Sequence, residues 1–195
     1  MSIKHLTLGI AMLSHIFLVS IDLDAAEFSQ VRPSNDEFMQ LPTENWLKNG
    51  GDFYNRNYSQ LDQINTSNVG EMIPLWRSHL AGSGVEARFS GEAQPIVQDG
   101  IMYIITGADD VFALSVETGE ILWSTLANLS SEISTVCCGW TSRGVAIGED
   151  KVFVGQLDGV LKAINKESGD TVWSIQAEDW REGYTITSAP LYFDG

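Results

Sequence analysis

The chain has 195 residues, enough for one ordinary domain or for part of a larger one. Hydrophobic residues make up 44% of it and charged residues 19%, so it can bury a core and is not an intrinsically disordered protein. Acidic residues outnumber basic ones by 26 to 11, and the formal net charge of −15 excludes nucleic acid as an expected partner because phosphates would be repelled.

Residues 1–26 are predicted to be a secretory signal peptide. Lys4 precedes an apolar run, and small residues end the segment at Ala26. Ser14 and His15 interrupt the run, which is therefore short for a membrane-spanning helix of about 20 mainly apolar residues. An uncleaved anchor is the alternative interpretation.

Motifs of several common enzyme classes are absent from the sequence. It contains no HExxH, GxGxxG, GxxxxGK[ST] or GxSxG string, so it gives no support for a zinc protease, a dinucleotide or nucleoside triphosphate site, or a hydrolase nucleophile. Two of the three histidines lie within residues 1–26, which excludes a histidine-rich metal site in the remainder.

A repeat of 50 residues runs through the second half of the chain. Residues 97–103 align with residues 147–153, and residues 113–123 align with residues 163–173. A repeat of this length indicates supersecondary units that are stacked or arranged radially.

Each repeat unit is predicted to contain three or four short β-strands. In the first unit the β-branched and aromatic runs are residues 102–106, 111–116 and 121–124, separated by Gly and Asp turn strings. Radial repetition of such sheets gives an all-β fold, a β-propeller. Gly119 is expected at a left-handed corner and Trp123 between neighbouring blades, a tryptophan-docked arrangement.

The number of units is small. Residues 190–195 repeat the start of the first unit at residues 95–100, and an earlier, divergent unit ends near Trp76. Two to three blades are therefore expected, whereas closed propellers have about 4 to 8. Residues 27–195 are predicted to be the N-terminal part of a propeller domain truncated at its C-terminus.

Cys137 and Cys138 are adjacent. Neighbouring Cα atoms are about 3.8 Å apart, less than most disulfides span, and a bridge between neighbours would add little chain-entropy stabilisation. The residues alone leave three possibilities open, namely two buried thiols, a vicinal disulfide, or pairing with another chain.

Four segments, residues 50–59, 92–95, 134–146 and 184–190, resemble the dehydrogenases of the methanol/ethanol type that depend on pyrroloquinoline quinone (PQQ). The resemblance extends over about residues 45–195. It implies an eight-bladed propeller with PQQ on its axis, in a periplasmic enzyme that oxidises primary alcohols or aldehydes. Hydride would pass to PQQ and electrons onward to a cytochrome c.

The resemblance also assigns cofactor-binding residues. Cys137 and Cys138 match a vicinal disulfide that lies against the quinone, and Arg143 matches an arginine at the cofactor rim. Glu92 matches a glutamate that hydrogen-bonds an edge of PQQ, and Thr187 matches a threonine that meets a PQQ carboxylate. For the last three, the alternatives are a surface salt bridge, a solvated loop carboxylate and strand packing.

Other parts of such a site are expected after Gly195. These are the ligands of Ca²⁺ or a lanthanide, the catalytic aspartate and further PQQ contacts, so no catalytic or metal-binding residue is predicted within the chain. Trp140 departs from the family's pattern and either shapes the entrance or packs between blades. The turn aspartates are predicted to be turn formers; they are Asp99, Asp109, Asp110, Asp158 and Asp194.

Two functional alternatives stay open. One is a PQQ-dependent dehydrogenase of sugars or polyvinyl alcohol. The other is a non-catalytic propeller scaffold that binds proteins, although neither cysteine lies near the signal peptide as a lipoprotein would require. The chain alone is expected to be inactive even if the whole protein is an enzyme.

Overall fold

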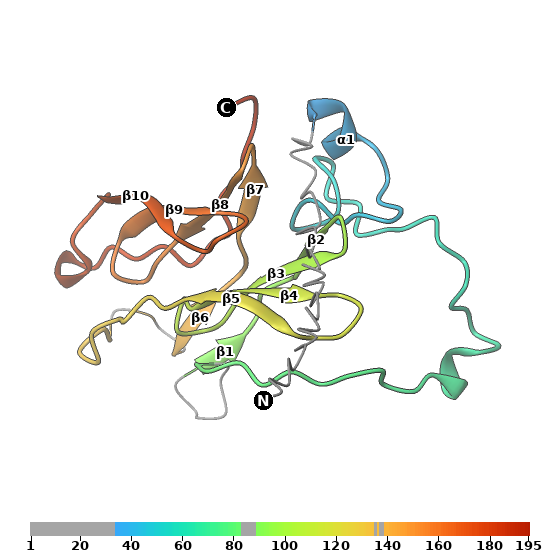
Figure 1. Cartoon of the computed structure of the whole chain (residues 1–195). Helices are drawn as coiled ribbons and strands as arrows, with labels where there is room; N and C mark the ends of the chain where they lie inside the picture. The colour runs from blue at the N-terminus through green and yellow to red at the C-terminus, as the bar shows by residue number, and fades with distance from the viewer. Residues whose placement is uncertain (1–33, 83–88, 135, 137–138) are drawn as a thin grey trace, which may run out of the picture.

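The computed structural model describes residues 34–82, 89–134, 136 and 139–195. The described residues form two four-stranded antiparallel sheets and one two-stranded parallel pair (Figure 1). The first sheet contains β2 (Ile96–Gln98), β3 (Ile101–Ile105), β4 (Val111–Ser115) and β5 (Ile121–Thr125). The second contains β7 (Ala146–Gly148), β8 (Lys151–Gly155), β9 (Val160–Asn165) and β10 (Thr171–Gln176). The parallel pair is β1 (Phe89–Gly91) with β6 (Trp140–Ser142).

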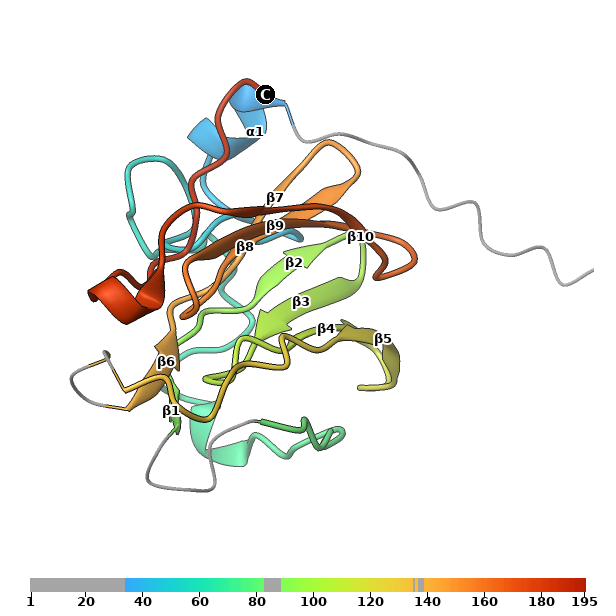
Figure 2. The same ribbon diagram turned by 90° about the vertical axis from the view of Figure 1, so that its left-hand side faces the viewer.

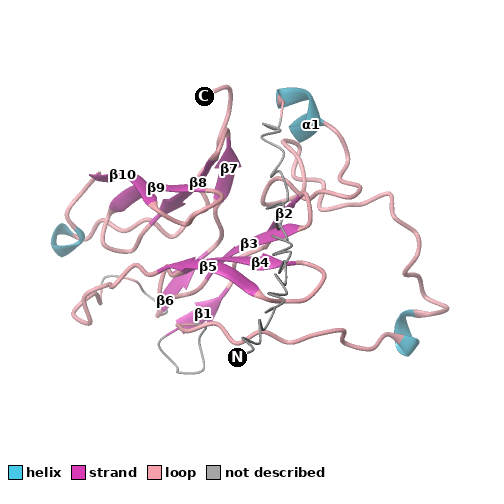
Figure 3. Ribbon diagram, in the orientation of Figure 1, coloured by secondary structure: helices cyan, strands magenta, loops and turns pink. Residues whose placement is uncertain are grey.

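Helical structure in the described part of the chain is short. It consists of α1 (Asn35–Met39) and the 3-10 turns η1 (Val69–Glu71) and η2 (Trp180–Glu182), while loops connect the strands (Figure 3). Ser34 and Glu37 form a capping box at the start of α1. No helix among these described residues has the length and apolarity needed to cross a bilayer. The predicted signal peptide lies outside the described residues.

The predicted strands of the first unit are confirmed within one residue at each end by β3, β4 and β5. The second sheet repeats the first with the predicted 50-residue shift. In the first sheet Ile101 pairs with Ser115, and in the second Lys151 pairs with Asn165. The sequence repeat is thus a repeat of strand register, and the all-β partial propeller is confirmed.

The two sheets lie one above the other (Figure 2). Buried side chains from both sheets form one shared hydrophobic core. Side chains along β3 alternate between buried and partly exposed, so one face of the strand supplies the core. The second sheet contributes Val152 and Val154, both fully buried, and α1 adds Phe38. Burying one large aliphatic side chain contributes roughly 1.5–3 kcal/mol, so this layer holds neighbouring units together.

Tryptophans join one unit to the next, as the repeat predicted. Trp123 of β5 donates from Nε1 to the carbonyl of Lys166 in the second sheet at 3.0 Å. Trp76 makes the equivalent bond to Val116 at 2.8 Å. The glycine three residues after each acceptor has a positive φ, and a Cβ on Gly119 would lie 2.4 Å from the Trp76 ring. Only glycine leaves room for the docked indole.

Candidate cofactor-binding site

Arg143 lies between β6 and β7 and joins two other residues that the sequence predicted to bind PQQ. Its Nη1 donates to Thr187 Oγ1 at 2.8 Å, and its Nη2 lies 3.1 Å from Glu92 Oε2. The Arg143 backbone N–H also donates to the Thr187 carbonyl at 3.0 Å. Three residues spread over almost 100 positions of sequence thus form one cluster.

The cluster follows from how the strands pair. In the parallel pair of β1 and β6, Gly91 lies opposite Ser142, so the next residues, Glu92 and Arg143, are neighbours. Thr187 precedes Pro190 as Glu92 precedes Pro95, at the start of a repeat unit. The beginnings of successive units therefore converge.

The cluster is accessible to a ligand. The Arg143 and Glu92 side chains are 48% and 44% exposed. An ion pair as exposed as this one contributes at most about 1 kcal/mol, so a ligand carboxylate can share the guanidinium at little cost.

A cleft of about 780 Å³ adjoins Arg143. Its polar lining includes Lys48, Asn49, Asn57 and Gln94, and Phe53 and other apolar residues complete the wall. Among the described residues that line it there is no Asp or Glu, although the chain has 26 acidic residues. This local excess of cations and amide donors favours an anionic ligand.

Lys48 is partly buried in the wall of this cleft. Its Nζ donates to the Asn49 carbonyl at 2.6 Å and to Asn55 Oδ1 at 2.5 Å. Burial lowers the pKa of Lys48, and the charge of Asp52 partly opposes the shift.

Other predicted residues have different outcomes. Cys137 and Cys138 lie outside the described residues, so the vicinal disulfide stays a prediction. Trp140 is 7% exposed, packs against Ile133 and Leu157, and donates from Nε1 to the Ile133 carbonyl at 3.0 Å. Of the two roles considered for Trp140, the structure shows packing.

Asp109 is a buried acid that the sequence did not reveal. It has the left-handed φ of a turn residue, 59°, but it is only 1% exposed. Its Oδ2 accepts the Leu157 backbone N–H at 2.6 Å, whereas Oδ1 has no hydrogen-bond partner in the described structure. Burial, with the nearby charges of Asp158 and Asp110, raises the pKa of Asp109 to about 8 despite the Leu157 hydrogen bond and Lys162.

A metal site needs side chains that could together hold the ion. Within residues 34–82, 89–134, 136 and 139–195, no three His, Cys, Asp or Glu side chains come together in a way that could hold one. The family resemblance implies that ligands of Ca²⁺ or a lanthanide lie outside these residues.

The docked, repeated sheets define a partial β-propeller, and comparison with known proteins identifies its kind. Residues 46–174 match the PQQ family, described as the glucose/ethanol/alcohol dehydrogenase β-propeller domain. The chain belongs to this family of PQQ-dependent dehydrogenases.

Two relatives match almost the whole chain. It is 37% identical over 185 residues to quinoprotein alcohol dehydrogenase PedH of Pseudomonas putida, a match that covers 92% of this chain and 30% of PedH. It is 34% identical over 185 residues to methanol dehydrogenase (cytochrome c) subunit 1 of Methylobacterium organophilum, covering 89% of this chain and 29% of the relative.

Solved structures agree. The quinohemoprotein alcohol dehydrogenase of Comamonas testosteroni superposes with a TM-score of 0.73 at 32% identity, over 84% of this chain and 24% of its own. A europium-containing methanol dehydrogenase superposes with a TM-score of 0.70 at 29% identity, over 82% and 28%. The chain spans less than a third of the length of each of these four proteins.

Proposed function

We propose that the chain is the N-terminal part of a PQQ-dependent dehydrogenase that oxidises a primary alcohol or an aldehyde. The observation that supports this most strongly is the contact of Arg143 with both Glu92 and Thr187. Sequence resemblance alone selected these three residues, and the fold brings them together at an exposed place beside the cleft that Lys48 and Arg143 line.

The cluster has the chemistry that PQQ requires. PQQ is a planar tricarboxylate with adjacent quinone carbonyls, so it needs cationic and hydroxyl donors at its rim. The Arg143 guanidinium can bind a carboxylate through two N–H groups, the Thr187 hydroxyl can donate to another oxygen, and Glu92 can accept an N–H from the ring edge. Cys137 and Cys138 are proposed to cover one face of the ring.

These residues would bind and orient the cofactor. When bound, PQQ supplies a quinone that accepts a hydride from the alcohol carbon. The Glu92 carboxylate holds Arg143 from one side and the Thr187 hydroxyl holds it from the other, which fixes the direction of the guanidinium before a ligand arrives. We propose that Ca²⁺ or a lanthanide acts as the accompanying Lewis acid, with ligands outside this chain.

We also propose a compartment and an electron acceptor. A signal peptide at residues 1–26 would direct the protein to the periplasm. A cytochrome c is the proposed acceptor, since the names of two relatives include it, the methanol dehydrogenase above and a 1-butanol dehydrogenase of Thauera butanivorans that is 40% identical over 153 residues.

The test is reconstitution of the full-length protein after removal of PQQ. PQQ with either Ca²⁺ or a lanthanide should restore reduction of an acceptor dye or cytochrome c by primary alcohols. Arg143→Ala should weaken PQQ binding by about 100-fold, the loss of a charge-assisted pair of hydrogen bonds. Arg181→Ala is the matched control, because Arg181 pairs with Asp179 on the exposed surface.

Each other outcome has a meaning. Turnover of sugars or polyvinyl alcohol but not of primary alcohols would replace the proposed substrate. Absence of PQQ binding with either Ca²⁺ or a lanthanide would favour the alternative of a non-catalytic scaffold that binds proteins. PQQ binding that is unchanged in Arg143→Ala would remove the cluster from the cofactor site.

A further inference from the structure

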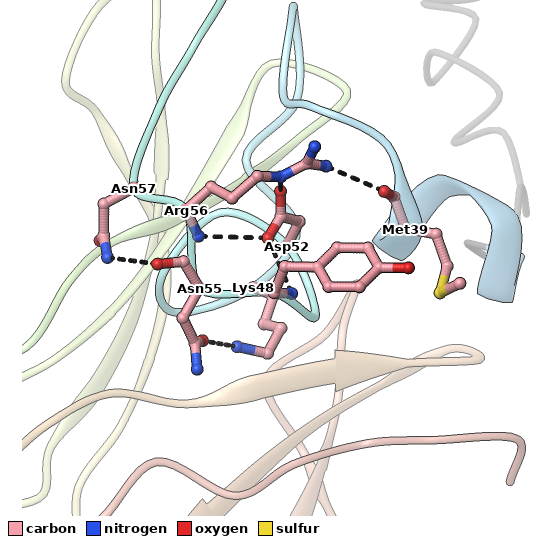
Figure 4. Close-up of polar contacts among 7 residues, drawn as sticks. Met39, Lys48, Asp52, Asn55, Arg56 and Asn57 are labelled. Carbon is pink, nitrogen blue, oxygen red and sulfur yellow. Dashed lines mark hydrogen bonds and ion pairs between the residues drawn. The ribbon is translucent and has the colours of Figure 1, made fainter.

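The segment of residues 50–59 resembles the family, and several of its residues line the cleft beside Arg143. It forms a loop built around Asp52, whose side chain is fully buried. Asp52 Oδ1 accepts the backbone N–H groups of Tyr54 at 2.9 Å and Arg56 at 3.3 Å, and Oδ2 pairs with Arg56 Nε. Arg56 also donates to the Met39 carbonyl at 3.0 Å, which fastens the loop to α1 (Figure 4).

Electrostatics and glycines both favour a single shape for this loop. Burial alone would raise the pKa of Asp52, but the hydrogen bonds from Arg56 and Tyr54 outweigh it and lower the pKa, so the carboxylate stays charged. Gly50 and Gly51 have φ of 86° and 88°. A Cβ on Gly50 would lie 2.6 Å from Asn55 Oδ1, so a larger residue would displace the Asn55 side chain, and the positive φ would strain it in addition.

The loop meets the cluster of Arg143, Glu92 and Thr187 at two points. Asn49, just before it, donates from Nδ2 to the Arg143 carbonyl at 2.9 Å. The Gly50 N–H donates to Gln94 Oε1 at 2.8 Å, two residues after Glu92. One end of the loop therefore holds both the segment that carries Arg143 and the segment that carries Glu92.

The hydrogen bond from Asn49 holds the carbonyl of Arg143, and the orientation of this peptide group affects where the Arg143 side chain points. The Arg143 carbonyl belongs to the peptide group shared with Gly144, whose φ is 138°. Glycine gives this peptide a rotational freedom that other residues lack, so an external partner is needed to fix it. The Asn49 amide is such a partner, and Thr187 fixes the other side of Arg143 through its N–H.

We propose that Asn49, held by the loop of residues 50–59, is a positioning residue for Arg143. It keeps the Arg143 backbone in the orientation from which the guanidinium reaches Glu92 and Thr187, and so prepares the cluster for a cofactor carboxylate. This role rests on the proposed function, since the ligand is the same PQQ.

The first experiment compares two asparagines of the same segment. Asn49 and Asn45 are both partly buried, and each makes one hydrogen bond to a distant backbone group, Asn45 through Oδ1 to the Asp99 N–H at 2.9 Å. PQQ is titrated into cofactor-free full-length protein and followed by tryptophan fluorescence. Asn49→Ala should weaken binding about tenfold, whereas Asn45→Ala should change it by less than about twofold, with similar losses of thermal stability.

An isosteric variant separates positioning from packing. Asn49→Leu keeps roughly the size of the side chain and removes the donor to the Arg143 carbonyl without adding a charge beside an anionic ligand. It should weaken PQQ binding about as much as Asn49→Ala. Full affinity in Asn49→Leu would overturn the proposal, as would equal losses in Asn49→Ala and Asn45→Ala.

A double-mutant cycle tests whether Asn49 acts through Arg143. In an Arg143→Ala background, Asn49→Ala should have no further effect on PQQ affinity, because the residue that it positions is gone. Independent, additive losses would contradict the positioning role. If the full-length protein binds no PQQ, the proposed function fails; if it binds PQQ but the double-mutant cycle shows additive losses, only the positioning role fails, so the two failures are distinguishable.

Discussion

The sheets β2–β5 and β7–β10 have the same strand register and the same tryptophan docking, yet different residues occupy two of their equivalent positions. In the turn after β3, Asp109 occupies the left-handed position that Gly159 occupies in the turn after β8. In the loop after the third strand, Lys166 is the counterpart of Val116. The positions that the two sheets share determine the strands and turns of each sheet. The positions that differ are therefore candidates for contacts made at one place only.

Both differences place an ionisable group in the interface between sheets. Asp109 accepts the Leu157 N–H of the second sheet's turn, and Lys166 donates from Nζ to Gln98 Oε1 of the first sheet at 2.9 Å. Burial lowers the pKa of Lys166, although three nearby carboxylates oppose this shift. The interface between the two sheets thus consists of an apolar core, to which both sheets contribute, and of these two polar contacts at non-repeated positions.

The largest expected loss of stability comes from disrupting the tryptophan docking that the two sheets share. Gly119→Ala should destabilise the protein by about 2–5 kcal/mol, since the new Cβ would clash with Trp76 in a left-handed conformation. Gly100 has a similar φ, 77°, but nothing lies within 4 Å of its added Cβ. Gly100→Ala should therefore cost only about 1–2 kcal/mol. Equal losses in urea denaturation would show that docking does not require the glycine.

A smaller effect is expected from the contact at Asp109, and it should depend on pH. The pKa of Asp109 is about 8 in the folded protein and near 4 in an unfolded chain, so the folded state retains the proton. Its stabilising contribution is complete below about pH 4 and is lost as pH rises through about 8. Asp109→Asn removes this dependence.

The measurement is the free energy of unfolding of both proteins between pH 5 and pH 9. The stability of Asp109→Asn relative to the wild type should rise across this range by an amount on the order of a few kcal/mol. Asp99→Asn is the control, because Asp99 has a similar φ of 51° but is exposed. Parallel pH profiles for wild type and Asp109→Asn would mean that Asp109 is ionised in the fold.

The smallest effect concerns one hydrogen bond of the repeated interface. Thr125 of β5 donates from Oγ1 to the Gly169 carbonyl at 2.5 Å. Thr125→Val keeps the shape but removes the donor and should destabilise the protein by about 1 kcal/mol. Thr171→Val, at an exposed position of β10, should change stability by less than about 0.5 kcal/mol. If the two variants match, this bond adds nothing to docking.

The repeated part of the fold was predictable because its signal occurs twice. β3, β4 and β5 end within one residue of the predicted strands, and Gly119 and Trp123 take the predicted positions. Turn residues and the alternation of buried and exposed side chains determine these strands. Both signals lie within a few residues of each strand, so the sequence alone reveals them.

The non-repeated contacts were not predictable in the same way. The bond between Asn49 and Arg143 joins residues 94 positions apart, and Asn49 precedes the 50-residue repeat, so the repeat gives no signal for it. Asp109 looks like any turn aspartate, because its burial is due to the neighbouring sheet rather than to its own turn. The cluster of Glu92, Arg143 and Thr187 came from resemblance, and the pairing of β1 with β6 gives the physical reason for it.

A crystal structure of the full-length protein with PQQ bound would test directly whether the Arg143 cluster binds the cofactor. We predict a PQQ carboxylate within about 3 Å of the Arg143 guanidinium, with Glu92 and Thr187 contacting the same molecule. PQQ bound with its carboxylates away from Arg143, and the ion pair with Glu92 left unchanged, would contradict it.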